Sequence, residues 1–374
     1  MTMNGARVGI ACFLLAVYSM PQPASAQAKW KGTVVKEGDV TNVKNPKEPI
    51  YKTPILELKE ELLIGGPEAK GQEVFDDIGE FVVDDAGNFY ISDRKEDHIK
   101  VFDGAGRYLR TIGRHGQGPG EFEGIAGLSI VSLTGELVVY DVLQMRFSFF
   151  KTDGTYVRDL RYEEPRLGYA RLDSKGNVYA SATIFDMETF RSEEKTIYLN
   201  REATDPFMLT KEERVSEPNK IEIFMPKPFW TLDFSDNFIY GHSREYEIQF
   251  FKAGTHKLFK KIRKVYDPIP VSEDDIKEFR KPEFSSISMV FAKEHAAFRP
   301  FFISDTGHLF VETYEKAGDG YFIHDIFDKD GRLLARMPLR PRGLKVSQGK
   351  YYALEKDENG YQYVKRYAVT WKVK

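Results

Sequence analysis

Residues 81–94 read FVVDDAGNFYISDR, and residues 98–113 read HIKVFDGAGRYLRTIG. Short runs of alternating apolar residues are separated here by turns rich in Asp, Asn and Gly, as in successive antiparallel hairpins. The same plan returns as LSIVSLTGELVVYD from Leu128 and as RFSFFKTDGTYVRDL from Arg146. The two turn glycines lie 19 residues apart in both units, at Gly87 and Gly106 and again at Gly135 and Gly154. The chain therefore contains an internal repeat of short strands.

Weaker copies of this unit continue toward the C-terminus. They bring the first-turn positions to six: Gly87, Gly135, Gly176, Asn237, Gly307 and Gly349. Three or four short antiparallel strands per unit are typical of a β-propeller blade. The sequence predicts an all-β fold, a six-bladed β-propeller over residues 51–374 with short helical insertions between blades. A β-sandwich is the alternative, which explains short strands but not a repeated four-strand register.

The stretch DDAGNFYISDR (84–94) followed by HIKVFDGAGRYLRTIGRHGQGPGEF (98–122) resembles the NHL-type six-bladed β-propellers, especially the exported bacterial proteins of that class. The close match covers roughly residues 75–160. The resemblance implies the fold and says little about activity, because this fold hosts lyases, lactonases, RNA-binding proteins and scaffolds. Sugar-lactone hydrolases of this shape carry Glu-Gly-Pro near their start, and the GGPE at Gly65–Glu68 differs from it.

The glycine-rich segment GRHGQGPGEF (113–122) is not predicted to bind a phosphate. A phosphate-binding loop needs Gly-Lys-Ser/Thr at its end, and a dinucleotide-binding turn needs a βαβ setting, whereas EFEGIAGLSIV leads into another strand. The segment lies where one blade connects to the next. We expect its glycines to permit a tight path, and Phe122 to fill the core between two blades.

The N-terminus predicts export. Arg7 precedes the apolar run VGIACFLLAV, and the segment ends in Ala24-Ser25-Ala26, as in a signal peptide that is cleaved after residue 26. Cleavage removes Cys12, the one cysteine of the chain, so the mature protein is expected to have no disulfide and no thiolate chemistry. We expect a periplasmic or extracellular protein with no transmembrane segment after cleavage.

Residues 27–50 read as an extended leader, part of it polar enough to be disordered. We expect Ile55–Leu58 to join the last blade, near YQYVKRYAVTWKV, and so to close the ring. Insertions are predicted near 200–222, with a turn of helix, and near 267–299. In the second, Ser272 is a good N-cap for a helix through Ile276 and Phe279, Pro282 ends it, and SSISMVFAKEHAAF predicts another helix. This insertion is either a lid over one end of the ring or plain packing.

No sequence motif indicates a metal site or a catalytic serine. The seven histidines show no paired ligand spacing, so no cofactor is predicted, although a calcium or zinc ion in the tunnel stays possible for the enzymatic relatives that the resemblance implies. Basic residues at the loops that connect strands predict a rim able to bind a carboxylate or an acidic glycan: Arg94, His98, Arg114, His115, Arg146, Arg244 and Arg299. Alternatively, the arginines pair with the nearby acids Asp93, Asp141 and Glu245.

Two functions stay open on this evidence. The first is a scaffold of the cell envelope that binds a peptide, a partner protein or a glycan on one face of the propeller. The second is a lyase or hydrolase that acts on a carbohydrate or a lactone at the central tunnel, so whether the protein is an enzyme is undecided, with binding favoured. The net charge of −3 argues against a nucleic-acid partner.

Overall fold

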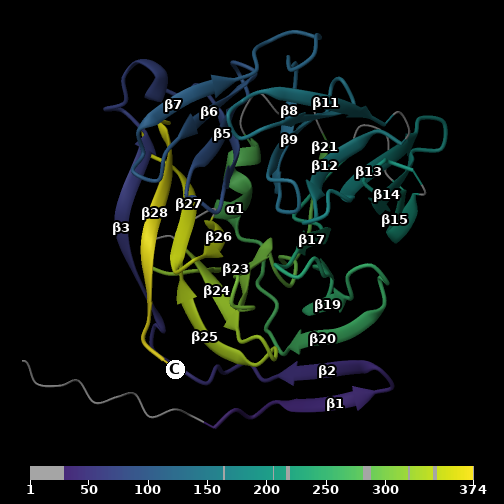
Figure 1. Cartoon of the computed structure of the whole chain (residues 1–374). Helices are drawn as coiled ribbons and strands as arrows, with labels where there is room; N and C mark the ends of the chain where they lie inside the picture. Colours follow the sequence, from purple (N-terminus) through teal and green to yellow (C-terminus); the bar gives the residue numbers. More distant parts are fainter. Residues whose placement is uncertain are drawn as a thin grey trace, which may run out of the picture.

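The computed structural model describes residues 29–162, 165–204, 206–215, 220–280, 288–318, 321–339 and 343–373. The predicted signal peptide at 1–26 lies outside these residues. Six sheets form a closed ring, which Figure 1 shows roughly along its axis. In blades 1, 2, 3 and 5 the four strands are antiparallel neighbours in sequence order from the axis outward, and the first strands of most adjacent blades contact one another. The predicted six-bladed propeller is confirmed.

The blades follow one another along the chain. Blade 1 contains β4 (Ile78–Val83), β5 (Phe89–Asp93), β6 (His98–Phe102) and β7 (Tyr108–Ile112). Blade 2 contains β8 (Ile125–Val131), β9 (Glu136–Asp141), β10 (Arg146–Phe150) and β11 (Tyr156–Arg161). Blade 3 contains β12 (Leu167–Leu172), β13 (Val178–Asp186), β14 (Arg191–Leu199) and β15 (Phe207–Val215).

The second half of the ring has the same order. Blade 4 contains β17 (Pro228–Leu232), β18 (Phe238–His242), β19 (Glu247–Phe251) and β20 (Leu258–Lys264). Blade 5 contains β22 (Phe301–Ile303), β23 (Leu309–Lys316), β24 (Phe322–Phe327) and β25 (Leu333–Pro338). Blade 6 contains β26 (Gly343–Ser347), β27 (Lys350–Lys356) and β28 (Gln362–Trp371).

The ring closes with a strand from the start of the chain. β3 (Leu56–Gly65) begins within the predicted closure segment Ile55–Leu58, pairs antiparallel with β28 and is the outermost strand of blade 6. The short 3₁₀ helix η1 (Gly71–Glu73) then leads into blade 1. Because the first and last parts of the chain share one sheet, the ring has no open seam between blades 6 and 1.

The predicted extended leader contains a β-hairpin. β1 (Thr33–Glu37) pairs with β2 (Val40–Asn45), and β2 runs parallel to β20, so blade 4 has six strands. The buried Asn45 accepts a hydrogen bond from Leu333 N at 2.8 Å and donates one to Gly331 O at 2.9 Å. These bonds fix the hairpin to blades 4 and 5.

The two insertions differ from their prediction. The helix expected near 200–222 is wrong, since Phe207–Val215 is the outer strand β15 and pairs with β14 over its length. The long spacing after blade 3 comes instead from strands of nine residues each. Residues 216–219 lie outside the described part, and β16 (Lys220–Ile223) follows them.

In the second insertion, α1 (Glu273–Lys277) and the 3₁₀ helix η2 (Glu278–Arg280) form where the first helix was predicted. The Ser272 hydroxyl accepts a hydrogen bond from Asp275 N, and the Asp275 carboxylate accepts one from Ser272 N, which is the expected capping box. Pro282 is outside the described residues. The second predicted helix is wrong at Ser288–Phe291, which forms β21 in a parallel pair with β16. The parallel partner, which is remote in sequence, overrides the local helix propensity.

The core lies between the blades. One buried cluster joins Ile99 and Val101 of blade 1 to Leu137 and Val139 of blade 2, and similar clusters join most of the other neighbours. The predicted plug, Phe122, is completely buried in the cluster between blades 1 and 2 and packs on Phe150 at 5.9 Å. Buried aromatic side chains therefore stabilise the packing of adjacent blades.

The ring has two distinct faces. At one, which we call the turn face, each inner strand turns into the second strand, with a residue of positive φ between 62° and 87°: Gly87, Gly135, Gly176, Asp236, Gly307 and Gly349. The sequence assigned the fourth position to Asn237, one residue too late. The opposite, connector face carries the loops between second and third strands and the links between blades.

Candidate functional site

The seven basic-rim residues predicted from the sequence belong to the connector face. They follow second strands, begin third strands or lie in links between blades, and they are distributed over blades 1, 2, 4 and 5: Arg94, His98, Arg114, His115, Arg146, Arg244 and Arg299. Their role in ligand binding stays a prediction. The burial and the hydrogen-bond and ion-pair partners of each side chain decide whether it is available to a ligand.

The exposed arginines of this set already have carboxylate partners. Arg94 pairs with Asp77 at 2.9 Å, and Arg114 with Glu121 at 2.7 Å. Arg244 pairs with Glu212 at 3.0 Å. The partners of Arg94 and Arg244 are thus not Asp93 and Glu245, their neighbours in the sequence.

Arg299 is also paired. Its Nε donates a hydrogen bond to Glu312, and its guanidinium lies 4.0 Å from the centroid of the Phe322 ring. Because the acid and the aromatic face occupy this guanidinium together, a ligand would have to compete with both.

Arg146 is a structural residue. Its side chain is only 1% exposed and donates hydrogen bonds to the carbonyl oxygens of Gln117, Gly118 and Glu121, in addition to its ion pair with Asp159 at 3.2 Å. Three of these four partners are backbone groups of the glycine-rich link between blades 1 and 2. Arg146 therefore fixes the path of this link.

The two histidines differ in their environments. His115 is exposed, and its Nδ1 lies 2.8 Å from a carboxylate oxygen of Asp97, which raises the pKa of the imidazole. His98 is half-buried, and burial lowers its pKa, with Lys100 adding to the effect. His98 is thus held neutral in a site where a cation is unfavourable.

A better candidate site lies on the ring axis. The inner strands β4, β8, β12, β17, β22 and β26, one from each blade, enclose a channel with a cavity of about 280 Å³. Inner strands are expected to be apolar, so polar groups that face this cavity identify a site. Charged residues of three inner strands line it: Glu80 of β4, Arg171 of β12 and Lys345 of β26. The turns that follow β12 and β17 add three carboxylates to the lining, Asp173, Asp233 and Asp236, and the Asp173 and Asp233 carboxylates accept hydrogen bonds within their own turns.

Glu80 is positioned by blades 1 and 2. Its Oε2 accepts a hydrogen bond from Leu128 N at 3.3 Å, and its own backbone N–H donates to Ser92 Oγ at 2.9 Å. Burial raises the pKa of the Glu80 carboxyl, an effect that the nearby positive charge of Arg171 partly opposes. The carboxyl therefore keeps its proton to a higher pH than an exposed glutamate does.

Arg171 has a tyrosine, rather than a carboxylate, as its neighbour. Its Nε donates a hydrogen bond to the hydroxyl of Tyr169 on the same strand, and burial raises the pKa of that tyrosine to about 12. The Tyr169 ring in turn packs on Trp230 of blade 4 at 5.2 Å. The guanidinium is thus held in place, and within the described residues its two terminal nitrogens form no hydrogen bond.

Lys345 lies at the turn-face end of the channel. Burial lowers its pKa, and the charge of Arg171 lowers it further. Its Nζ lies 5.7 Å from the ring centroid of Phe234 in blade 4. Among the residues that the structure describes, neither Lys345 nor Arg171 forms an ion pair with a carboxylate. Carboxylates act on both cations only at longer range, Glu80 on Arg171 and Asp85 with Asp305 on Lys345. Two cations that repel each other without an ion-paired acid favour an anion between them.

Sequence reasoning missed these channel residues. A signal was present, since IGEFVV, YARLD and GLKVS each place one charged residue inside an otherwise apolar inner strand. What the sequence did not supply is the direction of the side chain, which decides whether such a residue faces the axis or a neighbouring blade.

The described residues contain neither a metal-binding cluster nor a membrane-spanning helix. No group of three or more His, Cys, Asp or Glu side chains is arranged there to hold a metal ion. Within the same part of the chain, no helix combines the length and the apolar character needed to cross a membrane.

Comparisons with known proteins agree on the architecture. Residues 72–259 match the model of a family, DUF5128, described as a six-bladed β-propeller. No curated protein matches the sequence. The solved structure of BF0058 from Bacteroides fragilis NCTC 9343, named as an exported protein, is similar, with a TM-score of 0.54 and 10% identity over 89% of this chain and 100% of that one. A DUF4221 family member from Bacteroides vulgatus ATCC 8482 is similar with a TM-score of 0.50 and 10% identity over 84% and 99%. These similarities show the fold.

Proposed function

The chain belongs to the DUF5128 family of six-bladed β-propellers, and from this premise we propose that it is a binding protein that holds a small anionic ligand in its central channel. One observation carries the proposal: Arg171 and Lys345 face a common cavity, and no carboxylate among the described residues pairs with either. A ligand carboxylate between them would relieve their repulsion and form charge-assisted hydrogen bonds.

The proposal includes a location outside the cytoplasm, periplasmic or extracellular, and membership of the exported NHL-type propellers. The charged start, apolar run and Ala-Ser-Ala end of residues 7–26 support export, and the Bacteroides fragilis neighbour is itself named as exported. The hairpin repeat of blades 1 and 2 supports the NHL subtype. Net charge of −3 favours a peptide, protein or glycan as the source of the anion over a nucleic acid as partner.

Isothermal titration calorimetry on the purified mature protein tests the proposal. The probes are acetate, phosphate and D-gluconate, with glucitol as the uncharged match of gluconate. We expect at least one anion to bind, glucitol not to bind, and Arg171→Met to weaken the anion about tenfold or more, as expected for the loss of one charge-assisted contact.

The matched control is Arg94→Met, which removes an exposed, paired arginine of the connector face. It should leave the affinity unchanged. Absence of binding by every anion, or equal loss in both variants, would overturn the channel as the site.

A second candidate is an enzyme, a lyase or hydrolase of a carbohydrate or lactone at the same channel. The raised pKa of Glu80 favours it, because a carboxyl that retains its proton to a higher pH than an exposed glutamate is suited to general acid catalysis. Under this candidate, Glu80→Gln would abolish turnover of an added sugar lactone while anion binding persists. Turnover that is absent in the wild type, with binding present, supports the binding protein.

A further inference from the structure

An exposed aromatic residue stands at the turn-face end of the channel. Phe234 is 52% exposed and lies two residues before the positive-φ residue of its turn. The equivalent position holds Asp85, Ser174, Asp305 and Ser347 in four other blades, and the exposed Leu133 in blade 2. A phenylalanine in such a turn is not needed for the hairpin, which polar residues form equally well.

Phe234 and Lys345 also border a second cavity. It has a volume of about 190 Å³ and opens beside the first, with Val82 and Ile130 in the walls of both. Besides Val83 and Tyr352, its lining includes hydrogen-bonding side chains of the turn face: Asp84, Asp85, Ser132, Ser347 and Gln348. The Asp84 carboxylate already accepts bonds from Asn88 and Tyr90, whereas the Asp85 carboxylate accepts none within the described residues.

The other end of the channel is less open to a ligand. In Figure 1, α1 projects over the middle of the ring. Its Asp275 lies 3.2 Å from His295 Nε2, in the link that precedes β22, and this link belongs to the connector face. The second insertion therefore lies on the connector face, and the turn face is the side on which the two cavities offer entry.

Three kinds of group meet around Lys345: cations for a carboxylate, an aromatic face for a ring, and acceptors for hydroxyls. From this juxtaposition we propose that the channel ligand is an acidic sugar of the uronic acid type, which enters from the turn face. Its carboxylate reaches Lys345 and Arg171, the apolar C–H face of its ring packs on Phe234, and its hydroxyls donate to Asp85 and its neighbours. This inference rests on the proposed function, because it requires the anion site in the channel.

Titration calorimetry with three matched probes distinguishes the acidic-sugar inference from the simpler anion site. D-glucuronate has both the ring and the carboxylate, D-gluconate has the carboxylate on an open chain, and D-glucose has the ring alone. We expect glucuronate to bind roughly two- to tenfold more tightly than gluconate, which corresponds to one aromatic packing contact, and glucose not to bind measurably.

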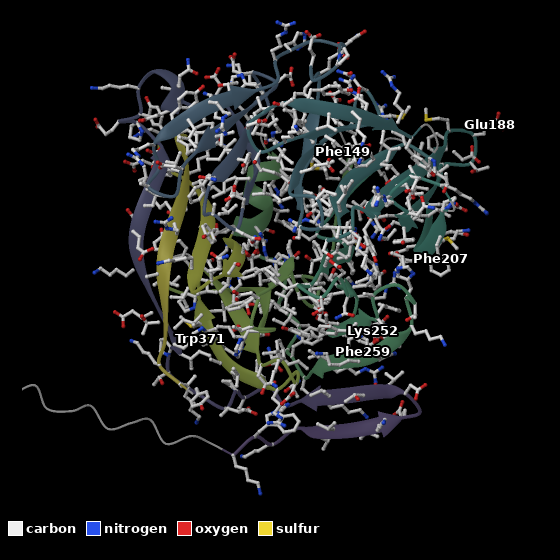
Figure 2. All side chains as sticks on the ribbon, viewed as in Figure 1. Phe149, Glu188, Phe207, Lys252, Phe259 and Trp371 are labelled. Atoms are coloured by element: carbon white, nitrogen blue, oxygen red, sulfur yellow. The ribbon has the colours of Figure 1, made fainter. Side chains whose placement is uncertain are left out.

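The variant Phe234→Ala should reduce the affinity for glucuronate by that same factor and leave gluconate unchanged. Phe207→Ala is the matched control, because Phe207 is 51% exposed but lies on the outer strand of blade 3, at the edge of the ring in Figure 2. It should change neither affinity.

The outcomes are distinct. Equal binding of glucuronate and gluconate, or an equal effect of Phe234→Ala on both, overturns the acidic-sugar inference and leaves the anion site standing. Failure of both acids to bind, together with failure of acetate and phosphate, removes the proposed function and this inference with it.

Discussion

The hydroxyl of Tyr246 in blade 4 donates a 2.5 Å hydrogen bond to the carboxylate of Asp325 in blade 5, and Asp325 is completely buried. The same carboxylate accepts a bond from Lys264 Nζ at 2.6 Å and from Arg336 Nε at 2.7 Å. One buried acid thus pairs with two cations at the junction between two blades, close to the sheet that the N-terminal hairpin extends, and Arg336 also pairs with Glu315. A buried group with three donors of this kind cannot be lost without leaving charges unpaired.

Replacing Asp325 by Asn should therefore destabilise the protein strongly. Arg336 would keep its pair with Glu315, but the buried Lys264 would be left beside a neutral amide. The free energy of unfolding should therefore fall by about 3 kcal/mol or more, as for other broken buried ion pairs. Urea denaturation measures the change. The control Asp330→Asn breaks an exposed pair with Arg332 and should change stability by less than about 0.5 kcal/mol. Equal values for the two variants would contradict the role of Asp325.

Replacing Arg146 should destabilise the protein, whereas replacing Arg114 should not, although the same ligand-binding role was predicted for both residues. Arg146→Met removes a donor from three carbonyl oxygens of the glycine-rich link, and of these Gly118 keeps its bond from Glu121 N. We therefore expect a loss of about 2–4 kcal/mol in the free energy of unfolding and faster proteolysis within residues 113–122. Arg114→Met removes only an exposed ion pair and should behave as the wild type in both measurements. Unchanged proteolysis of the Arg146 variant would show that the link does not depend on it.

Lys345 should be a residue whose removal stabilises the fold. Its charge is partly buried, repelled by Arg171 and unpaired, so Lys345→Met should raise the free energy of unfolding by about 1 kcal/mol while weakening anion binding. The two effects are read by urea denaturation and by calorimetry on the same samples. A destabilised variant would indicate that Lys345 has a structural partner instead.

Anion affinity should fall as the pH rises above the usual range of a glutamate. The pKa of Glu80 is raised, so its carboxyl is neutral just above pH 4.5 and gains its negative charge only as the pH passes the raised value. That new charge beside Arg171 repels an anionic ligand. Titrations between pH 4.5 and 8 should show the decline in the wild type, and Glu80→Gln should remove the part that belongs to this carboxyl. A flat profile in both proteins would exclude Glu80 from the site.

Much of this architecture was readable from local pattern. Gly87, Gly135 and Gly176 mark turns that need positive φ, and the alternation between them marks strands, so the number of blades followed from the repeat. Closure by a strand beginning near Ile55 followed from the lack of a repeat unit in that segment. The pattern failed where a distant partner decides the conformation, as in β15 and β21.

The sequence alone determined that the chain forms a ring of small sheets, because strand alternation and turn chemistry are properties of neighbouring residues. It also supplied the basic side chains, but not which of them are neutralised. Tertiary structure alone decided that Arg146 is buried against a link between blades and that Arg171 and Lys345 line one cavity without an ion pair to a carboxylate of the described residues. The physical reason is that pairing and burial depend on which blades face each other across the axis, over separations that no local pattern encodes.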